Sequence, residues 1–339
     1  MVAFPKPKVN FTYQVGDEIA ALRQYEQTAA GRDIPDKAVD RLLIASWNIA
    51  NLGVQQRRDD DYRIIADLLS WFDLIALQEV NDNLEGLRKL QSFLPPGYNL
   101  LFSDTAGNSE RLTFVYDSSK VTLLQKVGEI AIPPSQHKNI KLPGIAMPFQ
   151  GFDRNPYLAA FQAGGFSFIL VNVHLYFGKM TPKPMAETSI QRRSLETYAV
   201  ARWADNRRRS KNSYLRDVIA IGDFNLPRRD PEDPVFRALT RKGLKLPKHF
   251  TAVGSNLSGE DHYDQVAFHP AATTDSEFSG KAGVFDYDGA IFKALWDRFM
   301  NEHQNLTPAK QKQRAITAFR AYLRYYISDH RPLWVEFKT

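Results

Sequence analysis

Residues 218–227, which read VIAIGDFNLP, decide how the rest of this sequence is interpreted. Four apolar residues rich in β-branched types predict a buried strand, and Gly222 lets the backbone turn sharply where that strand ends. Asp223 and Asn225 follow two residues apart, so both side chains point to the same side and could hold a metal ion, a water or a phosphate. Taken alone, the pair could equally close an Asx turn.

The same pattern of an apolar strand with a polar side chain at its end recurs along the chain. The residues so placed are Asn48, Glu79, His174, Asp223 with Asn225, Asp264, and Asp329 with His330. Asn48 and Glu79 follow the two strands of a strand–helix–strand unit expected within residues 42–78. The carboxyl ends of the strands in such a βαβ-like unit gather on one edge of a sheet. Each residue alone could be a solvated or satisfied side chain, but their recurrence indicates one shared site.

This set of side chains predicts a particular chemistry. It offers several oxygen ligands, two imidazoles and no sulfur, because the chain has no cysteine. Hard oxygen ligands without thiolates select Mg²⁺, Mn²⁺ or Ca²⁺ over zinc. Two histidines beside a metal ion and carboxylates can supply a general base and a general acid.

Length and composition set the outer limits. With 339 residues, 43% of them apolar, and no linker-like block, the chain is expected to form one large α/β domain. A net charge of +6 and a pI near 9.2 suit a polyanionic partner without requiring one. The sequence shows neither a signal-peptide core nor an apolar run of membrane-spanning length, so we expect a cytoplasmic protein without membrane insertion.

Hydrophobic periodicity predicts the remaining elements. Helices are expected at residues 17–30, 61–71, 83–93, 189–209, 290–303 and 308–325, and further strands at 98–103, 111–117, 121–128, 157–162, 166–173 and 333–337. Residues 129–156 are rich in proline and are expected to form loops.

The motifs together resemble those of the endonuclease/exonuclease/phosphatase superfamily, whose fold is that of deoxyribonuclease I. The matching motifs are SWNIANLG (46–53), LQEVND (77–82), VNVHL (171–175), GDFN (222–225), YDQVAF (263–268) and SDHRPLWVEF (328–337). GDFN and SDHxP in this order, with QE upstream, are specific to that family. The resemblance implies a four-layer α/β/β/α sandwich, with two packed mixed sheets, outer helices and an active site at one edge.

The resemblance also implies roles for individual residues. Glu79 would be the main metal-binding carboxylate, with Asn48 beside it and Asp329 completing a site for Mg²⁺, or for Mn²⁺ or Ca²⁺. Asp223 and Asn225 would contact the scissile phosphate and the attacking water. Two histidine–carboxylate pairs, His330 with Asp264 and His174 with Glu110, would serve acid–base catalysis, and Arg154 resembles an arginine that touches a backbone phosphate in the nuclease branch.

Two parts of the chain depart from the family pattern. The first is residues 1–40, which are expected to form an N-terminal extension with a docked helix. The second is a helical insertion at about 283–327, within the catalytic domain expected at residues 41–339. Within that insertion, FDYDGA (285–290) contains Asp286 and Asp288, which we interpret as a helix N-cap and its neighbour rather than as a second metal site.

The preferred function is that of a divalent-metal-dependent phosphodiester hydrolase acting on DNA as an endonuclease. The alternative is a phosphomonoesterase or phosphodiesterase for a small or lipid phosphate, of the inositol phosphate or sphingomyelin type, because this fold hosts both. A non-catalytic binding module is disfavoured because the motif acids and both histidines are present. Arginines 207–209 could follow a DNA backbone or form a solvated face, and the sequence leaves the oligomeric state open.

Overall fold

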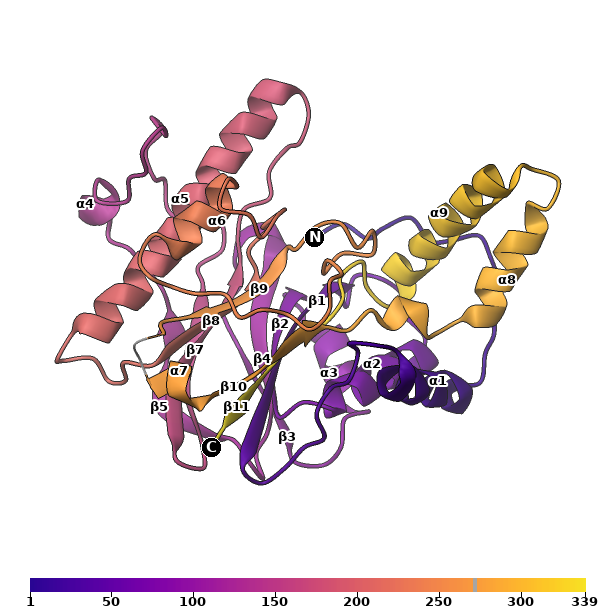
Figure 1. Ribbon diagram of the computed structural model, residues 1–339, viewed down its shortest axis with the longest axis horizontal. Coiled ribbons are helices and arrows are strands. Elements are labelled where there is room, and N and C mark those ends of the chain that lie inside the picture. The colour runs from indigo at the N-terminus through magenta and orange to yellow at the C-terminus, as the bar shows by residue number, and fades with distance from the viewer. Residues whose placement is uncertain (271–272) are drawn as a thin grey trace.

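A computed structural model describes residues 1–270 and 273–339, and in it two β-sheets pack against each other between outer helices (Figure 1). The strand order is β10-β11-β1-β2-β4-β3 in the six-stranded sheet and β5-β6-β7-β8-β9 in the five-stranded sheet. Both sheets mix parallel and antiparallel pairs. The predicted four-layer α/β/β/α sandwich is confirmed.

The strands of the two sheets come from most of the chain. They are β1 (Arg41–Leu52), β2 (Leu74–Asn81), β3 (Tyr98–Phe102), β4 (Glu110–Asp117), β5 (Thr122–Glu129), β6 (Tyr157–Ala163), β7 (Phe166–His174), β8 (Val218–Asp223), β9 (Asp264–Phe268), β10 (Phe278–Val284) and β11 (Leu333–Lys338).

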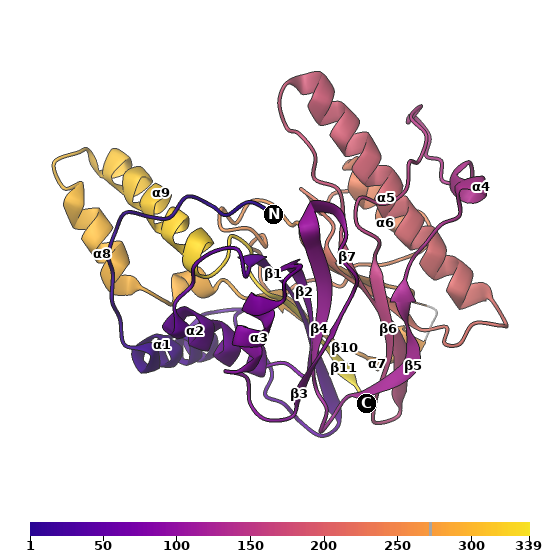
Figure 2. The same ribbon diagram turned by 180° about the vertical axis from the view of Figure 1, so that it is seen from behind.

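Helices cover both outer faces. They are α1 (Val15–Thr28), α2 (Asp59–Ser70), α3 (Glu85–Gln91), α4 (Pro134–His137), α5 (Lys183–Arg209), α6 (Pro234–Thr240), α7 (Thr273–Glu277), α8 (Lys293–Glu302) and α9 (Pro308–Tyr326). Side chains of α1, α2, α3, α8 and α9 share one hydrophobic core with the six-stranded sheet, whereas α5 and α6 pack on the five-stranded sheet. Figure 2 shows the two groups of helices on opposite sides of the sandwich.

Each sheet contains one parallel pair, and these pairs position the site. β1 is parallel to β2 with α2 between them in sequence, and β7 is parallel to β8 with α5 between them. A parallel pair needs such a crossover connection, so the expected βαβ unit is confirmed. Because parallel strands end at the same edge, His174 lies in register with Asp223. Asn48 likewise lies in register with Gln78, next to Glu79.

A buried polar contact joins the two sheets just inside this edge. Gln78 Nε2 donates to Asn172 Oδ1 (2.7 Å), and Asn172 Nδ2 donates to the carbonyl oxygens of Leu77 (3.0 Å) and Thr113 (3.1 Å). Gln78 and Asn172 are both fully buried. Buried amides require such partners, so the ends of β2 and β7 are held together beside Glu79 and His174, two of the predicted site residues.

The structure corrects several element predictions. β1 continues beyond residue 46 to Leu52, across a break in register after Asn48. β10 and α6 were not expected, and α5 begins at Lys183 rather than at residue 189. Since β10 ends at Val284, its last two residues belong to the sheet rather than to the helical segment placed at about 283–327.

Asp286 occupies the predicted N-cap position, that of the 3-10 helix Tyr287–Gly289, but its side chain makes no capping hydrogen bond. The Asp286 carboxylate instead accepts two hydrogen bonds from Arg32, at 2.8 and 2.7 Å. Asp288 accepts two from Arg331, both at 2.7 Å. Bidentate pairing to an arginine fixes a carboxylate more firmly than a cap contact does.

Among the described residues, no helix has the length and apolarity needed to cross a membrane.

Candidate active site

The polar residues predicted from the strand ends meet in one cavity of about 750 Å³ at the edge formed by the parallel pairs. Eight of the ten predicted residues line it: Glu79, Glu110, Arg154, His174, Asp223, Asn225, Asp329 and His330. The other two, Asn48 and Asp264, are buried and are bonded to residues of the lining. The structure therefore brings together every predicted site residue.

His174 and Glu110 form the first histidine–carboxylate pair. His174 Nδ1 lies 2.7 Å from Glu110 Oε1, although β4 and β7 belong to different sheets. Burial and the nearby Arg154 oppose a charge on this imidazole, but Glu110 and Asp223 outweigh them and raise the pKa of His174. The carboxylate therefore both orients the ring and favours its protonated form.

His330 and Asp264 form the second pair, with 2.7 Å between His330 Nδ1 and Asp264 Oδ2. The backbone around the histidine is fixed as well, because Trp47 Nε1 donates to His330 O (2.8 Å) and His330 N donates to Ser328 Oγ (2.9 Å). Burial opposes protonation of the imidazole, yet Asp264 and Asp223 raise the pKa of His330 well above its usual value.

Asp223 lies between the two imidazoles. Its Oδ2 atom is 3.7 Å from His174 Nε2 and 3.9 Å from His330 Nε2, and it accepts a hydrogen bond from Asn48 Nδ2 at 3.2 Å. Burial alone would raise the pKa of the Asp223 carboxyl, but the two histidines hold it below the usual value. Asp223 is thus a buried carboxylate kept ionised by the groups around it.

Glu79 and Asp329 form the acidic side of the cavity. Glu79 accepts hydrogen bonds from Asn48 Nδ2 (3.1 Å) and Asn51 N (2.9 Å). Burial, together with the charge on Glu79, raises the pKa of Asp329 to about 6, although His330 acts against the shift. A cation bound beside Asp329 and Glu79 would favour the ionised form of the Asp329 carboxyl.

The donor set fits a magnesium-like ion. Among the described residues, no group of three or more histidine, cysteine, aspartate or glutamate side chains is placed to hold a metal ion. Mg²⁺ usually keeps several waters and takes only one or two protein carboxylates together with substrate phosphates. Glu79 and Asp329, with Asn48 beside them, match that requirement.

Several residues at the site have left-handed backbone conformations. Glu79 has φ 58°, Asn225 has φ 52°, and Ala50 and Asn51 have φ 43° and 54°. Such conformations cost energy for residues other than glycine and concentrate at functional sites. Ala50, Asn51 and Glu79 lie within the register breaks of β1 and β2, so the departure from regular strand geometry accompanies the placement of Glu79 in the cavity lining.

Comparisons with known proteins support the resemblance indicated by the motifs. No model of a protein family matches the sequence. A curated relative, a deoxyribonuclease from Thioalkalivibrio sp. (strain K90mix), is 27% identical over 207 residues, which cover 57% of this chain and 49% of the relative. The chain thus spans about half the length of this curated relative.

Solved structures extend the likeness over most of the chain. An endonuclease/exonuclease/phosphatase family protein from Bacteroides thetaiotaomicron has a TM-score of 0.52 at 18% identity, covering 88% of this chain and 95% of its own. TDP2 from D. rerio, complexed with a single strand DNA product, has a TM-score of 0.55 at 16% identity, covering 88% and 99%. The chain has the endonuclease/exonuclease/phosphatase fold.

Within this endonuclease/exonuclease/phosphatase fold, Arg154 has more structural contacts than the sequence suggested. The side chain is buried, and its Nε donates to His174 O (2.8 Å) and lies 3.0 Å from Glu110 Oε1. Nη2 donates to Leu175 O (3.1 Å), and Nη1 lies 3.2 Å from Asp153 Oδ2. Each Nη atom retains a second N–H. Arg154 therefore positions the first histidine pair, and contact with a phosphate stays a prediction.

Sequence reasoning missed Glu196, a buried residue of α5 that supports the same region. Its carboxylate accepts from Asp153 N (3.2 Å), Tyr176 N (3.1 Å) and Arg192 Nε (3.1 Å). Burial raises the pKa of Glu196 to about 7. Glu196 thus connects the loop before β6 to the loop after β7. In the sequence its only signal is that an acidic residue falls on the apolar face of a predicted helix.

The arginines of α5 divide into two groups. Arg193 Nη1 donates to Asn225 O (2.8 Å) and supports the site. Arg208 and Arg209 instead pair with Asp205 at 3.0 Å each, and sixteen residues of helix, about 24 Å, separate Arg193 from Arg209. The last-turn arginines therefore lie far from the cavity, at the end of α5 that leads toward the start of β8.

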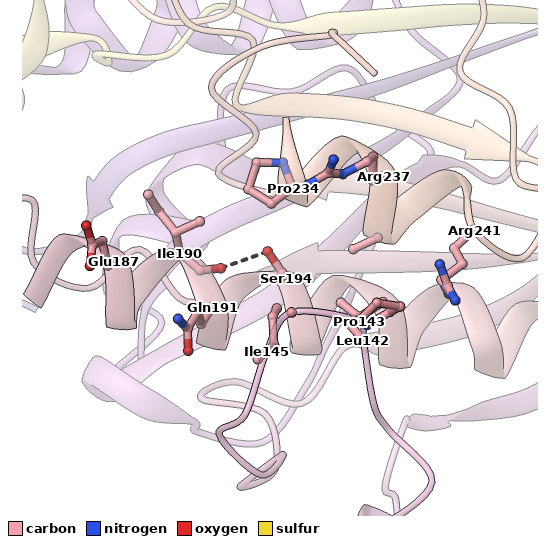
Figure 3. A pocket seen from close by; sticks show the side chains of 12 residues that line it. Leu142, Pro143, Ile145, Glu187, Ile190, Gln191, Ser194, Pro234, Arg237 and Arg241 are labelled. Atoms are coloured by element: carbon pink, nitrogen blue, oxygen red, sulfur yellow. Dashed lines mark hydrogen bonds between the residues drawn. The ribbon is translucent and has the colours of Figure 1, made fainter. Parts of the chain in front are cut away.

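A separate pocket of about 490 Å³ lies between α5, α6 and the loop at residues 142–145 (Figure 3). Glu187, Gln191, Arg237 and Arg241 supply its polar groups. None of the predicted catalytic residues lines this pocket, so it is not part of the candidate active site.

Proposed function

We propose that this chain hydrolyses phosphodiester bonds in DNA with the help of a divalent metal ion. The observation that carries the proposal is the convergence of two histidine–carboxylate pairs on a single oxygen of Asp223, beside the Glu79 and Asp329 carboxylates. Imidazolium donors, an ionised acceptor and a cation site are the groups that attack by water at phosphorus requires.

Glu79 and Asp329 would hold the ion, with Asn48 orienting Glu79 through its amide. We propose Mg²⁺, because the site offers few protein ligands and all of them are oxygen atoms. Bound there, the ion would supply positive charge to a phosphate oxygen and to the charge that develops during the reaction.

The charge of each remaining side chain determines the role that we propose for it. Asp223 stays ionised, so it can accept a hydrogen bond from the attacking water and orient it. Glu110 and Asp264 favour the protonated forms of His174 and His330, and in those forms the imidazoles can donate to phosphate oxygens and to the leaving oxygen. The amide of Asn225 is anchored by its Nδ2 bond to Leu175 O (2.7 Å), which fixes its position beside the phosphate.

Three observations favour DNA as the substrate. The curated relative is named a deoxyribonuclease, and one solved structure of the same fold was complexed with a single strand DNA product. The excess of six positive charges favours a polyanion. A small or lipid phosphate ester is the competing substrate class.

The test is nicking of supercoiled plasmid by the purified full chain in Mg²⁺ or in EDTA. We expect cleavage only with Mg²⁺, and a loss of about 100-fold or more in Glu79→Gln and in His330→Ala. Glu85→Gln is the matched control, because Glu85 is an exposed glutamate near the same strand and should retain activity.

Melting curves of each variant separate unfolding from loss of chemistry. Release of phosphate or p-nitrophenol from small esters without any nicking would move the assignment to the small-molecule or lipid branch. If the folded wild type hydrolysed neither kind of substrate with Mg²⁺ or Mn²⁺, the proposal would be rejected.

A further inference from the structure

A groove along α9 opens into the catalytic cavity. It has a volume of about 450 Å³ and shares Tyr263, Asp329 and His330 with the cavity. Its α9 wall consists of Gln313, Thr317, Arg320, Ala321 and Arg324, together with Ile316. Most of these residues are three or four positions apart and therefore share one face of the helix. From residue 313 to residue 324 the wall extends about 16 Å.

The charge of α9 is one-sided. It contains Lys310, Lys312, Arg314, Arg320 and Arg324 and no acidic residue. Within residues 1–270 and 273–339, none of these five side chains forms an ion pair with a carboxylate of the protein. Of the five, only Arg320 and Arg324 line the groove among the described residues, and cations so placed without anionic partners suit a polyanion that comes from outside the chain.

Two of these arginines lie in the groove itself. Arg320 makes one long contact, 3.5 Å from its Nη2 to Ser258 O, and its side chain is only partly buried. Arg324 stacks on the ring of Phe4, 4.4 Å from the centroid, and its Nε is buried without a hydrogen-bond partner in the described part of the chain. Phe4 lines the catalytic cavity, so Arg324 marks the junction of cavity and groove.

Beyond Arg320 the groove continues into an aromatic pocket of about 450 Å³, with which it shares Leu257, Ile316 and Arg320. Trp296 and Phe319 form its aromatic part, with ring centroids 5.7 Å apart. Asp297 also lines it and could accept hydrogen bonds from amino groups. A flat heterocycle fits such surroundings, because aromatic side chains stack on bases of any sequence.

We propose that this path binds a single strand of nucleic acid next to the bond that is cut, with phosphates on Arg320 and Arg324 and one unpaired base against Trp296. The inference rests on the proposed function for the position of the reacting phosphate. It narrows the substrate to single-stranded nucleic acid, because a base inside a duplex cannot enter the pocket without leaving its stack.

Binding is tested in EDTA, where cleavage is prevented, with a fluorescein-labelled 15-nucleotide single strand and fluorescence anisotropy. We expect Arg320→Glu to weaken binding at least tenfold and to lower the slope of log K against log salt by about 0.7 for each lost phosphate contact. Arg314→Glu is the matched control, because it makes the same charge change on the same helix outside the groove and should stay within about twofold. Equal losses in both variants, or none in either, would overturn the proposal.

Two further measurements test the base pocket. The wild type should bind the single strand at least tenfold more tightly than the fully paired duplex of the same sequence. It should also quench a 2-aminopurine placed in the single strand, and Trp296→Leu should lose that quenching while keeping a cooperative melting transition. Equal affinity for the duplex would overturn the proposal, whether or not the Trp296 variant folds.

The proposed function is tested separately by hydrolysis of bis(p-nitrophenyl) phosphate by the wild type, because so small a diester does not need the groove. Strand binding that depends on Arg320 in a protein that cleaves no ester would leave the binding site in place and reject the chemistry. If the protein cleaved the ester but its strand binding did not depend on Arg320, the proposed chemistry would stand and the proposed binding site would be rejected.

Discussion

Asp223 has two carboxylate oxygens with different tasks. Oδ1 accepts the backbone N–H of Asn225 at 2.8 Å, which shapes the turn after β8. Oδ2 faces His174, His330 and the amide of Asn48. Oδ2, which we propose accepts a hydrogen bond from the attacking water, thus lies among nitrogen groups that can donate hydrogen bonds, so its position and charge need little reorganisation.

The pair of Glu110 and His174 gives a pH prediction. Because carboxylates raise the pKa of His174 against the effect of burial, removing the charge of Glu110 lowers that pKa. If the imidazolium is the active form, activity falls as the pH rises through the pKa. Glu110→Gln should therefore shift the alkaline limb of the pH–rate profile to lower pH by about one unit or more.

The profile is measured as kcat/KM on plasmid or on a small diester from about pH 5 to pH 10. Glu232→Gln changes an exposed glutamate outside the cavity lining and should leave the limb in place. An unshifted limb in Glu110→Gln with reduced activity at every pH would show that His174 does not control the alkaline limb.

Which individual residues could be predicted depended on the source of the signal. Asp223, Asn225 and Glu79 follow apolar strands, so local pattern pointed to them. The partner of His174 lies 64 positions away, and only the family resemblance pointed to Glu110. The four main-chain and carboxylate partners of Arg154 depend on how loops pack, and no sequence pattern encodes such contacts.

The end of α9 is joined to β1 by one buried arginine. Arg57 donates through Nε to Tyr326 O (3.1 Å), and through Nη2 to Ile327 O (2.9 Å) and to Ile49 O and Ala50 O (2.7 Å each). The last carbonyls of a helix lack partners within the helix; Arg57 satisfies that of Tyr326 and, just beyond the helix, that of Ile327. It also fixes the strained stretch of β1 that follows Asn48.

Replacing this arginine should loosen both elements. We expect Arg57→Met to reduce the free energy of unfolding by about 3 kcal/mol or more, because it leaves several buried carbonyl oxygens without donors. The melting temperature and the denaturant midpoint measure the loss. Arg63→Met, on the neighbouring α2, is the control, because Arg63 is exposed and contacts Phe93 by stacking alone. Similar stability in both variants would contradict the capping role.

Element boundaries were hardest to predict where chain geometry is irregular. The prediction for β1 stopped at residue 46 because Ala50 and Asn51 take left-handed conformations that no apolar alternation reveals. β10 reads FSGKAGV and contains two glycines, so it lacks the β-branched run typical of a strand. It is ordered by pairing with β11 instead, a tertiary contact outside the reach of local propensity.

The N-terminal segment connects parts of the molecule that are distant in sequence. Phe11 packs against Phe292 and Tyr322, with centroid distances of 5.8 and 6.0 Å, and Tyr13 lies 4.8 Å from Phe292. Tyr13 also donates to Asp61 (2.6 Å). The segment therefore closes the core shared by α2, α8 and α9, and we propose that residues 1–40 belong to the structural unit of the catalytic domain.

Removal of residues 1–14 should expose this aromatic surface. We expect a loss of about 3 kcal/mol in the free energy of unfolding, since full burial of one such side chain contributes about 1.5–3 kcal/mol and Phe11 and Tyr13 are both partly buried, together with stronger binding of a hydrophobic dye. The double variant Phe11→Ala/Tyr13→Ala keeps the backbone and should reproduce most of the loss. Unchanged melting temperatures in both proteins would show that the N-terminal segment does not stabilise the core.

The positions of the two chain ends also bear on how the protein can be handled. Met1, Val2 and Phe4 line the catalytic cavity, whereas Lys338 pairs with Arg41 at the opposite end of β1 from Asn48 (Figure 1). A purification tag or fluorescent label joined before Met1 would therefore begin at the rim of the cavity and compete with substrate for space. The same label joined after Thr339 would lie at the far end of the sheets, and a protein immobilised there would present its active site to the solution.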